Sequence, residues 1–235
     1  MRIWDVNPGY LNRQSLLGEH RELHGIYIIL KEHKKGYSKH PETLRWKGYG
    51  WALHQRHTII REEMKLRGYK DQSPVRSFSN QDVWPEKYID LPEDQFKLLE
   101  SKYKDKESGR MPLPKTTQEL WAQHKYSVLA RDPETYKAIG KRVSTLKQKK
   151  DFSDLSLELT EILRQPVKGN RLRNALEHMW GYVADYSLVK RETLDTFDSI
   201  DLLAEVRAMT VQHKVPYLIT STAISELGAW IKGNG

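Results

Sequence analysis

The chain has 235 residues, of which 38% are hydrophobic and 30% charged, and its formal net charge is +8. It contains no cysteine, which excludes disulfides, thiolate catalysis and cysteine-ligated zinc or iron–sulfur centres. Residues 1–70 carry 14 Lys and Arg against 7 Asp and Glu, whereas residues 71–235 carry 25 against 24. This local positive charge favours a polyanionic partner such as nucleic acid, with a solvated basic surface as the alternative.

No stretch approaches the roughly 18 consecutive apolar residues of a membrane span. The first residues also lack the apolar segment of a signal peptide. We therefore expect a cytoplasmic protein with no membrane partner.

Apolar residues at helical spacing predict a first helix over residues 11–35, with Gly36 as its stop. Gly18 and Gly25 lie inside this helix, and each costs about 1 kcal/mol relative to alanine. Such glycines predict that something approaches the helix backbone closely.

Residues 36–50 are rich in Gly, Pro and Ser and predict a structured loop. A second helix is predicted over residues 51–67, ended by Gly68. Residues 76–115 are turn-rich and polar, and we interpret them as a linker that contains one helix over residues 93–104.

Thr116 and Glu119 have the spacing of a capping box, so a new domain is predicted over residues 116–235. Its helices are predicted over residues 118–130, 155–163, 171–186, 200–212 and 216–230. A further helix is predicted to begin at Pro133, with Asp132 as its cap. No hairpin signal or sustained alternation occurs. The fold class expected is all-α, with two helical domains, 1–75 and 116–235, joined by the linker.

Four sequence blocks stand out in the first domain. They are MRIW at residue 1, LLGEHREL at residue 16, GYSKHPETLRW at residue 36 and HQRHTIIREEMKLRGY at residue 54. Their order and spacing resemble the pyrimidine dimer DNA glycosylase/AP lyase family of the bacteriophage endonuclease V type. The resemblance implies a helical domain that bends DNA, flips a nucleotide and attacks C1′ with the chain's own α-amine. The resulting imine permits β-elimination, so no metal and no other cofactor is expected.

The resemblance assigns the chemistry to three residues. It aligns Glu22 with the family's essential carboxylate and Arg21 with a neighbouring arginine that engages DNA, and it puts Met1 at the nucleophile position. An α-amine, with a reference pKa of about 7.7 to 8.0, is closer to neutrality than lysine. A carboxylate such as Glu22 can stabilise an oxocarbenium ion, protonate the ring oxygen and help to abstract the 2′ proton. The alternative is that Arg21 and Glu22 are solvated helix charges.

Three positions depart from the phage pattern. Met1 stands where the phage enzyme exposes a threonine amine after removal of its initiator Met, Ser15 replaces a histidine and Gly25 replaces an arginine. The further residues expected to contact nucleic acid are the basic, histidine and aromatic side chains Arg2, Arg13, His20, His24, Lys39, His40, Arg45, Trp46, Lys47, Arg56 and His57. Trp46 is expected to stack on a base.

Histidines of the first domain raise the question of a metal. His54 and His57 are three apart on a predicted helix and could face one ion. No third ligand is evident, so we predict no metal site. His24 lies one turn from His20, a spacing that suits a proton relay or a phosphate contact.

The second domain carries another resemblance, to an uncharacterised helical domain of the YbgA type over about residues 118–185. It rests on HKYSVLA at residue 124, YKAIG at residue 136 and NALEHMWGY at residue 174. His178 in the last block is expected to be a buried histidine that holds helices together. Binding of other nucleic acid is predicted from the basic residues Lys141, Arg142, Lys147, Lys149, Lys150, Lys168, Arg171 and Arg173, with a solvated face as the alternative.

The sequence thus predicts a monomeric DNA repair glycosylase with AP lyase activity, whose partner is double-stranded DNA with pyrimidine dimers or related damaged bases. Two alternatives stay open. One is a non-catalytic nucleic-acid-binding protein, and the other is an enzyme that acts on modified bases or on RNA.

Overall fold

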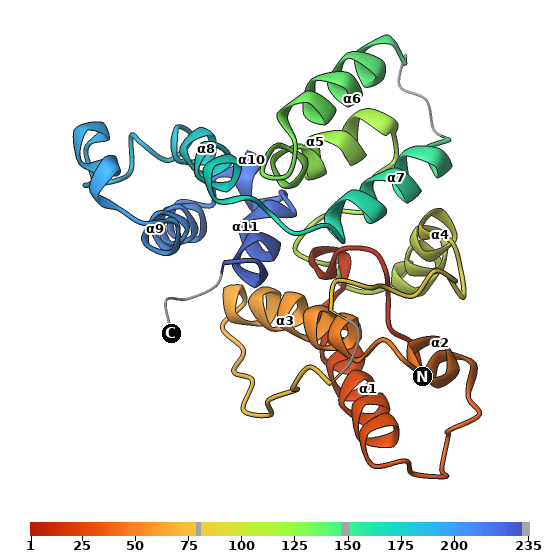
Figure 1. Ribbon diagram of the computed structural model, residues 1–235. Coiled ribbons are helices and arrows are strands. Elements are labelled where there is room, and N and C mark those ends of the chain that lie inside the picture. Colours follow the sequence, from red (N-terminus) through yellow and green to blue (C-terminus); the bar gives the residue numbers. More distant parts are fainter. Residues whose placement is uncertain (79–80, 147–150, 232–235) are drawn as a thin grey trace. The chain divides into compact units, whose positions relative to one another are not determined.

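The computed structural model describes residues 1–78, 81–146 and 151–231. The chain divides into two compact units, Met1–Gly109 and Arg110–Gly235. All regular elements among the described residues are helices, which confirms the all-α prediction (Figure 1). None of these helices combines the length and the hydropathy that a membrane span requires.

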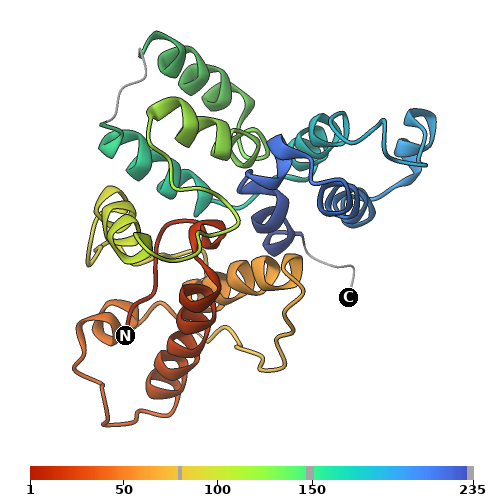
Figure 2. The same ribbon diagram turned by 180° about the vertical axis from the view of Figure 1, so that it is seen from behind.

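The first unit consists of the short 3₁₀ helix η1 (Pro8–Tyr10) and the α-helices α1 (Arg13–Lys31), α2 (Pro41–Trp46), α3 (Gly50–Leu66) and α4 (Pro92–Tyr103). Helices α1 and α3 pack against each other, as both views show (Figures 1 and 2). Helix α1 begins at Asn12, whose side-chain oxygen accepts a hydrogen bond from the Ser15 amide at 2.9 Å. Gly68, with φ of +79°, follows α3 as expected.

Helix α2 lies inside the segment that was expected to be a loop. The His40 ring accepts a hydrogen bond from the Glu42 amide at 3.1 Å, and Pro41 occupies the first helical position. Histidine is not among the preferred capping residues, so the pattern did not reveal this start. His40, predicted to contact nucleic acid, therefore caps a helix.

The expected linker, residues 76–115, is largely part of the first unit, and the division of the chain lies at residue 109. Helix α4 anchors this segment to the N-terminal residues. The Gln95 side chain accepts hydrogen bonds from the amides of Asp5, at 2.8 Å, and Val6, at 3.3 Å. Tyr103 accepts another from the Asn12 amide at 3.0 Å. The polar composition of α4 concealed these contacts in the sequence.

The second unit contains α5 (Thr117–Leu129), α6 (Pro133–Thr145), α7 (Ser153–Leu163), α8 (Gly169–Trp180), η2 (Arg191–Thr196), α9 (Ser199–Gln212), α10 (Pro216–Ile219), α11 (Ala223–Glu226) and η3 (Leu227–Ala229). Helix α5 contacts α6, α7, α8 and α11, and α8 contacts α9. The Thr116 cap of α5 is confirmed, since its hydroxyl accepts from the Glu119 amide at 3.2 Å, whereas the reciprocal bond of a capping box is displaced to the amide one residue earlier. The Glu119 carboxylate accepts from the Lys115 amide at 2.7 Å.

The helix predicted over residues 216–230 is broken into three short pieces. At the break, the Thr222 amide donates to the Gln123 carbonyl at 2.8 Å, and the Thr222 hydroxyl lies 2.7 Å from that of Ser127. These bonds to α5 replace the local bonds that a continuous helix would make.

Three of the basic residues predicted to bind nucleic acid in the second unit form ion pairs with acids, whereas Lys141 and Lys168 are exposed. Arg142 pairs with Glu158, Arg171 with Asp132 at 3.2 Å, and Arg173 with Glu177 at 2.5 Å. Lys147, Lys149 and Lys150, which were also predicted to bind nucleic acid, lie outside the described residues. Binding of nucleic acid by this unit stays a prediction.

The buried histidine of the second unit is His124, whereas His178 is exposed, contrary to the expectation. On α8 the buried positions are Leu172, Ala175, Leu176, Met179 and Trp180, a helical stripe that leaves residue 178 on the other side. His124 lies 2.8 Å from the Leu120 carbonyl oxygen, and burial lowers its pKa to about 4.

We expect His124 to make the unfolding free energy depend on pH. Its folded pKa lies below the ordinary value of about 6.5, so the unfolded chain binds more protons between these two values. The stability that depends on the neutral His124 is therefore retained above about pH 6.5 and is lost as the pH falls toward 4. The loss between pH 7 and pH 5 should be about 2 kcal/mol. Urea denaturation of the full chain at both pH values measures this loss of unfolding free energy. The substitution His124→Gln should remove the contribution of His124 to it. An equal pH dependence in both proteins would contradict the assignment.

Candidate functional site

The start of the chain is held by two carboxylates of α1. The backbone N–H of Arg2 donates to the Glu22 carboxylate, and that of Trp4 donates to Glu19 Oε1 at 3.1 Å. Glu19 and Glu22 are three residues apart and share one side of the helix. Standard bond lengths keep the backbone nitrogens of adjacent residues within about 4 Å of each other. The α-amine of Met1 therefore lies close to the Arg2 N–H that donates to Glu22.

Glu19 also forms a buried ion pair with Arg56 of α3. Arg56 Nε lies 2.8 Å from Glu19 Oε1, Nη2 lies 3.0 Å from Oε2, and Nη1 donates to the Val6 carbonyl at 3.0 Å. Both side chains are almost fully buried. Burial raises the pKa of Glu19 to about 7, and the Arg56 guanidinium and the Trp4 amide oppose this rise. The pair joins α1, α3 and the N-terminal segment.

Arg45 of α2 holds the same segment from another side. It pairs with the carboxylate of Asp5, with Glu42 at 3.0 Å, and donates to the Ile3 carbonyl at 3.3 Å. The indole of Trp46 donates to Glu42 at 2.9 Å.

Four of the residues predicted to contact nucleic acid, Arg45, Trp46, Arg56 and His57, are buried in the first unit. This corrects the expectation for Trp46, which is only 1% exposed and cannot stack on a base from that position. The physical reason is that buried carboxylates neutralise the two arginines and give the indole N–H an acceptor. A basic and aromatic sequence block can therefore belong to the core.

A cavity of about 410 Å³ opens beside the N-terminal segment. Its walls consist of Arg2, Trp4, Gln14, Ser15, Gly18, Glu19, Glu22, Leu98, Ser101 and Lys102. Arg2 pairs with Asp90 at 2.5 Å, and its guanidinium lies 4.9 Å from the centroid of the Trp4 ring. A Cβ added at Gly18 would meet no atom within 4 Å, so the space beside this glycine is open.

The surface over residues 1–70 is strongly basic. Its exposed Lys and Arg residues are Arg13, Arg21, Lys31, Lys34, Lys35, Lys39, Lys47, Arg61, Lys65 and Lys70, whereas Glu32 is the one exposed acid in this range. Arg21, expected at the reaction centre, lies three residues from Gly18 and donates to the Leu17 carbonyl at 3.3 Å. Arg13, Lys39 and Lys47 keep the exposure that a contact with phosphate requires.

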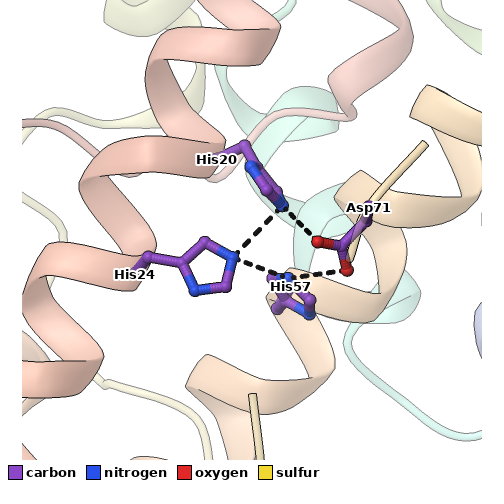
Figure 3. Close-up of side chains that lie close together, drawn as sticks. All are labelled: His20, His24, His57 and Asp71. Carbon is purple, nitrogen blue, oxygen red and sulfur yellow. Dashed lines mark hydrogen bonds and ion pairs between the residues drawn. The ribbon is translucent and has the colours of Figure 1, made fainter. Parts of the chain in front are cut away.

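A second cluster combines His20 and His24 of α1, His57 of α3, and Asp71 (Figure 3). The ligand atoms of these four residues all lie within 4.8 Å of one another. Burial lowers the pKa of both His24 and His57, which favours neutral imidazoles. His54, the other histidine considered from the sequence, instead lies with Nδ1 2.6 Å from the Val75 carbonyl oxygen.

Glu19, Lys102 and Asp71 were not predicted from the sequence as site residues. Glu19 could have been found, because its spacing from Glu22 puts both carboxylates on one side of a helix. Lys102 and Asp71 carried no such signal, since each lies far along the chain from its partners, Lys102 on the polar helix α4 and Asp71 in the segment after Gly68. The structure brings Glu19 and Lys102 to the cavity and Asp71 to the histidines.

The fold and the sites define a helical protein whose first unit combines a carboxylate-lined cavity at the chain start with a basic surface. Comparison with family models agrees with both resemblances seen in the sequence. Residues 1–77 match the family described as pyrimidine dimer DNA glycosylase, and residues 125–224 match one described as a protein of unknown function, DUF1722. Neither curated proteins nor solved structures gave a match to the chain.

We expect Arg56→Met to lower the unfolding free energy by about 3 to 5 kcal/mol, because it leaves the Glu19 carboxylate buried without its partner. Urea denaturation of the full chain measures the loss. Arg61→Met is the matched control, since Arg61 is an exposed arginine of the same helix, and it should change stability by less than about 0.5 kcal/mol. Equal effects of the two substitutions would show that the ion pair is unimportant.

Proposed function

We propose that the chain is a DNA glycosylase with AP lyase activity on pyrimidine dimers or related damaged bases, and that the α-amine of Met1 is its nucleophile. One observation carries the proposal. Glu22 accepts the backbone N–H of Arg2 at a cavity wall, within a region that matches a DNA glycosylase family. The carboxylate to which the resemblance assigns the chemistry thus accepts a hydrogen bond from the residue next to Met1.

The reaction proposed begins when the neutral amine attacks C1′ of the damaged nucleoside. A bond forms from nitrogen to C1′, and the glycosidic bond breaks with its electron pair leaving on the base, which takes up a proton. The nitrogen then loses one of its two protons to solvent, and its lone pair opens the C1′–O4′ bond while Glu22 gives a proton to the ring oxygen; the product is a cationic imine that keeps one N–H. Removal of a 2′ proton by the Glu22 carboxylate expels the 3′ phosphate.

The charge distribution supports DNA as the substrate. Exposed Arg and Lys far outnumber exposed acids over residues 1–70, which attracts a polyanion by release of its counterions. Arg2 lines the cavity with Gly18 and Glu22, and the exposed Arg21 precedes Glu22 on α1, so both suit contacts with phosphates beside the damaged nucleotide. Arg13, Lys39 and Lys47 are proposed to extend this contact.

Borohydride added to the protein with abasic-site DNA should trap a covalent adduct, because the reductant converts the imine into a stable amine. The adduct is measured as a shifted band in a denaturing gel, with chelator present. Acetylation of the N-terminus should abolish it, since an amide nitrogen is not a nucleophile.

Intact mass of the N-terminus is the necessary control, because the proposed chemistry requires Met1 with a free amine. An adduct that persists when the N-terminus alone is fully acetylated would assign the nucleophile to a lysine. Absence of an adduct from the unmodified protein would instead favour the non-catalytic nucleic-acid-binding alternative.

Glu22→Gln should lower strand-nicking turnover by about 10² to 10⁴, the usual contribution of a positioned acid or base. The amide can still accept a hydrogen bond from Arg2, so the chain start keeps its support. Gel-based single-turnover kinetics measure the rate, and Glu32→Gln, an exposed glutamate just after α1, is the control. Trapping without turnover would put Glu22 after imine formation, and unchanged turnover would remove it from the mechanism.

Gly18→Ala and Gly25→Ala form a matched pair, because a Cβ at either position meets no atom within 4 Å. Each should stabilise α1 by about 1 kcal/mol. Only Gly18 lines the cavity, so only Gly18→Ala should weaken the binding of lesion DNA, by crowding the approach to the backbone. Fluorescence anisotropy with labelled duplexes tests this difference, and equal affinities of the two variants would argue against a close approach at Gly18.

A further inference from the structure

Four donor groups from three segments of the first unit converge on one point between α1 and α3 (Figure 3). The Nε2 atom of His24 lies 3.2 Å from Nε2 of His20 and 3.2 Å from Nε2 of His57. The two oxygens of Asp71 close the ring, at 3.2 Å from His20 and 3.4 Å from His57. All three histidines therefore present the same nitrogen to a common centre.

Hydrogen bonds alone do not account for this arrangement. An imidazole nitrogen has a single in-plane site, which carries either a hydrogen or a lone pair. If His20 and His57 both donate to Asp71, His24 faces two nitrogens that have no lone pair to offer and no further hydrogen to give. Every other assignment of protons likewise satisfies at most two of the four contacts. The arrangement is better explained if the four groups are ligands of one cation, which accepts a lone pair from each of them.

We propose that His20, His24, His57 and Asp71 bind one zinc ion. Three imidazoles and a carboxylate are the nitrogen and oxygen ligands that zinc takes in proteins, whereas calcium and magnesium prefer oxygen. With zinc-to-ligand distances of about 2.0 to 2.2 Å, neighbouring donors of a tetrahedral site lie about 3.4 Å apart. The contacts of 3.2 to 3.4 Å fall close to this length.

The position of the site indicates a structural role. His20 and His24 are one turn apart on α1, His57 belongs to α3, and Asp71 follows the Gly68 turn. None of the four residues lines the cavity beside Glu22. Four protein ligands also complete a tetrahedral shell, which is typical of structural zinc. The ion would fasten α1 to α3 and to the segment after it, and this replaces the expectation that the chain holds no metal.

The test is the metal content of the full-length protein, purified without chelator and measured by plasma mass spectrometry. We expect about one zinc per chain. His24→Gln should lose this zinc, because the central histidine of the ring is removed. His54→Gln is the matched control on α3, since His54 contacts the Val75 carbonyl and not the cluster, and it should keep the metal.

A second measurement does not depend on a variant that must fold. Wild-type protein stripped with dipicolinate should gain on the order of 10 °C in Tm when zinc is restored, because the ion binds only the folded chain. His24→Gln should show no such rise. Metal-free wild-type protein whose Tm does not respond to zinc would overturn the proposal, as would equal zinc content in the two histidine variants. Borohydride trapping is independent of these readouts, so failure of either proposal is recognised separately.

Discussion

The first unit depends on the buried ion pair between Glu19 and Arg56. Taking two charges out of water costs several kcal/mol for each ion, and such a pair is tolerated only where further hydrogen bonds satisfy it. Here Glu19 also accepts the Trp4 amide, and Arg56 also donates to the Val6 carbonyl. The pair therefore fixes backbone that belongs to no helix or sheet, and the N-terminal segment obtains its position from side chains. This is how the chain start comes to lie beside Glu22.

Helix α1 carries two different groups of side chains. Glu22 follows His20 by two residues, which rotates it by about 200° around the helix axis. The carboxylates consequently line the cavity, while His20 and His24 meet His57 of α3. A metal ion at the histidines would restrain rotation of α1 and hence the direction of its carboxylates. A structural ion of this kind is compatible with chemistry that uses only an amine and a carboxylate.

The sequence was sufficient for features that depend on neighbouring residues and insufficient for those that depend on distant ones. Helices α1 and α3 follow from apolar periodicity and glycine stops, so their existence was predicted. Gln95 was assigned to a linker because its partners lie some 90 residues earlier. The indole of Trp46 next to Arg45 has the same sequence pattern whether it faces DNA or the core, and a buried Glu42 decided the outcome. Asp71 completes a cluster with His20 that only the folded chain assembles.

Most of the acidic residues in residues 1–70 are buried, whereas most of the basic residues are exposed. Five of the seven acids in residues 1–70 have buried carboxylates, namely Asp5, Glu19, Glu42, Glu62 and Glu63. Each buried arginine is matched by such a carboxylate, so these pairs add almost nothing to the outer field. The exposed cations are thereby left with hardly any acids among them. The exposed charges over this region are thus almost all positive, and its attraction for DNA should weaken steeply with salt.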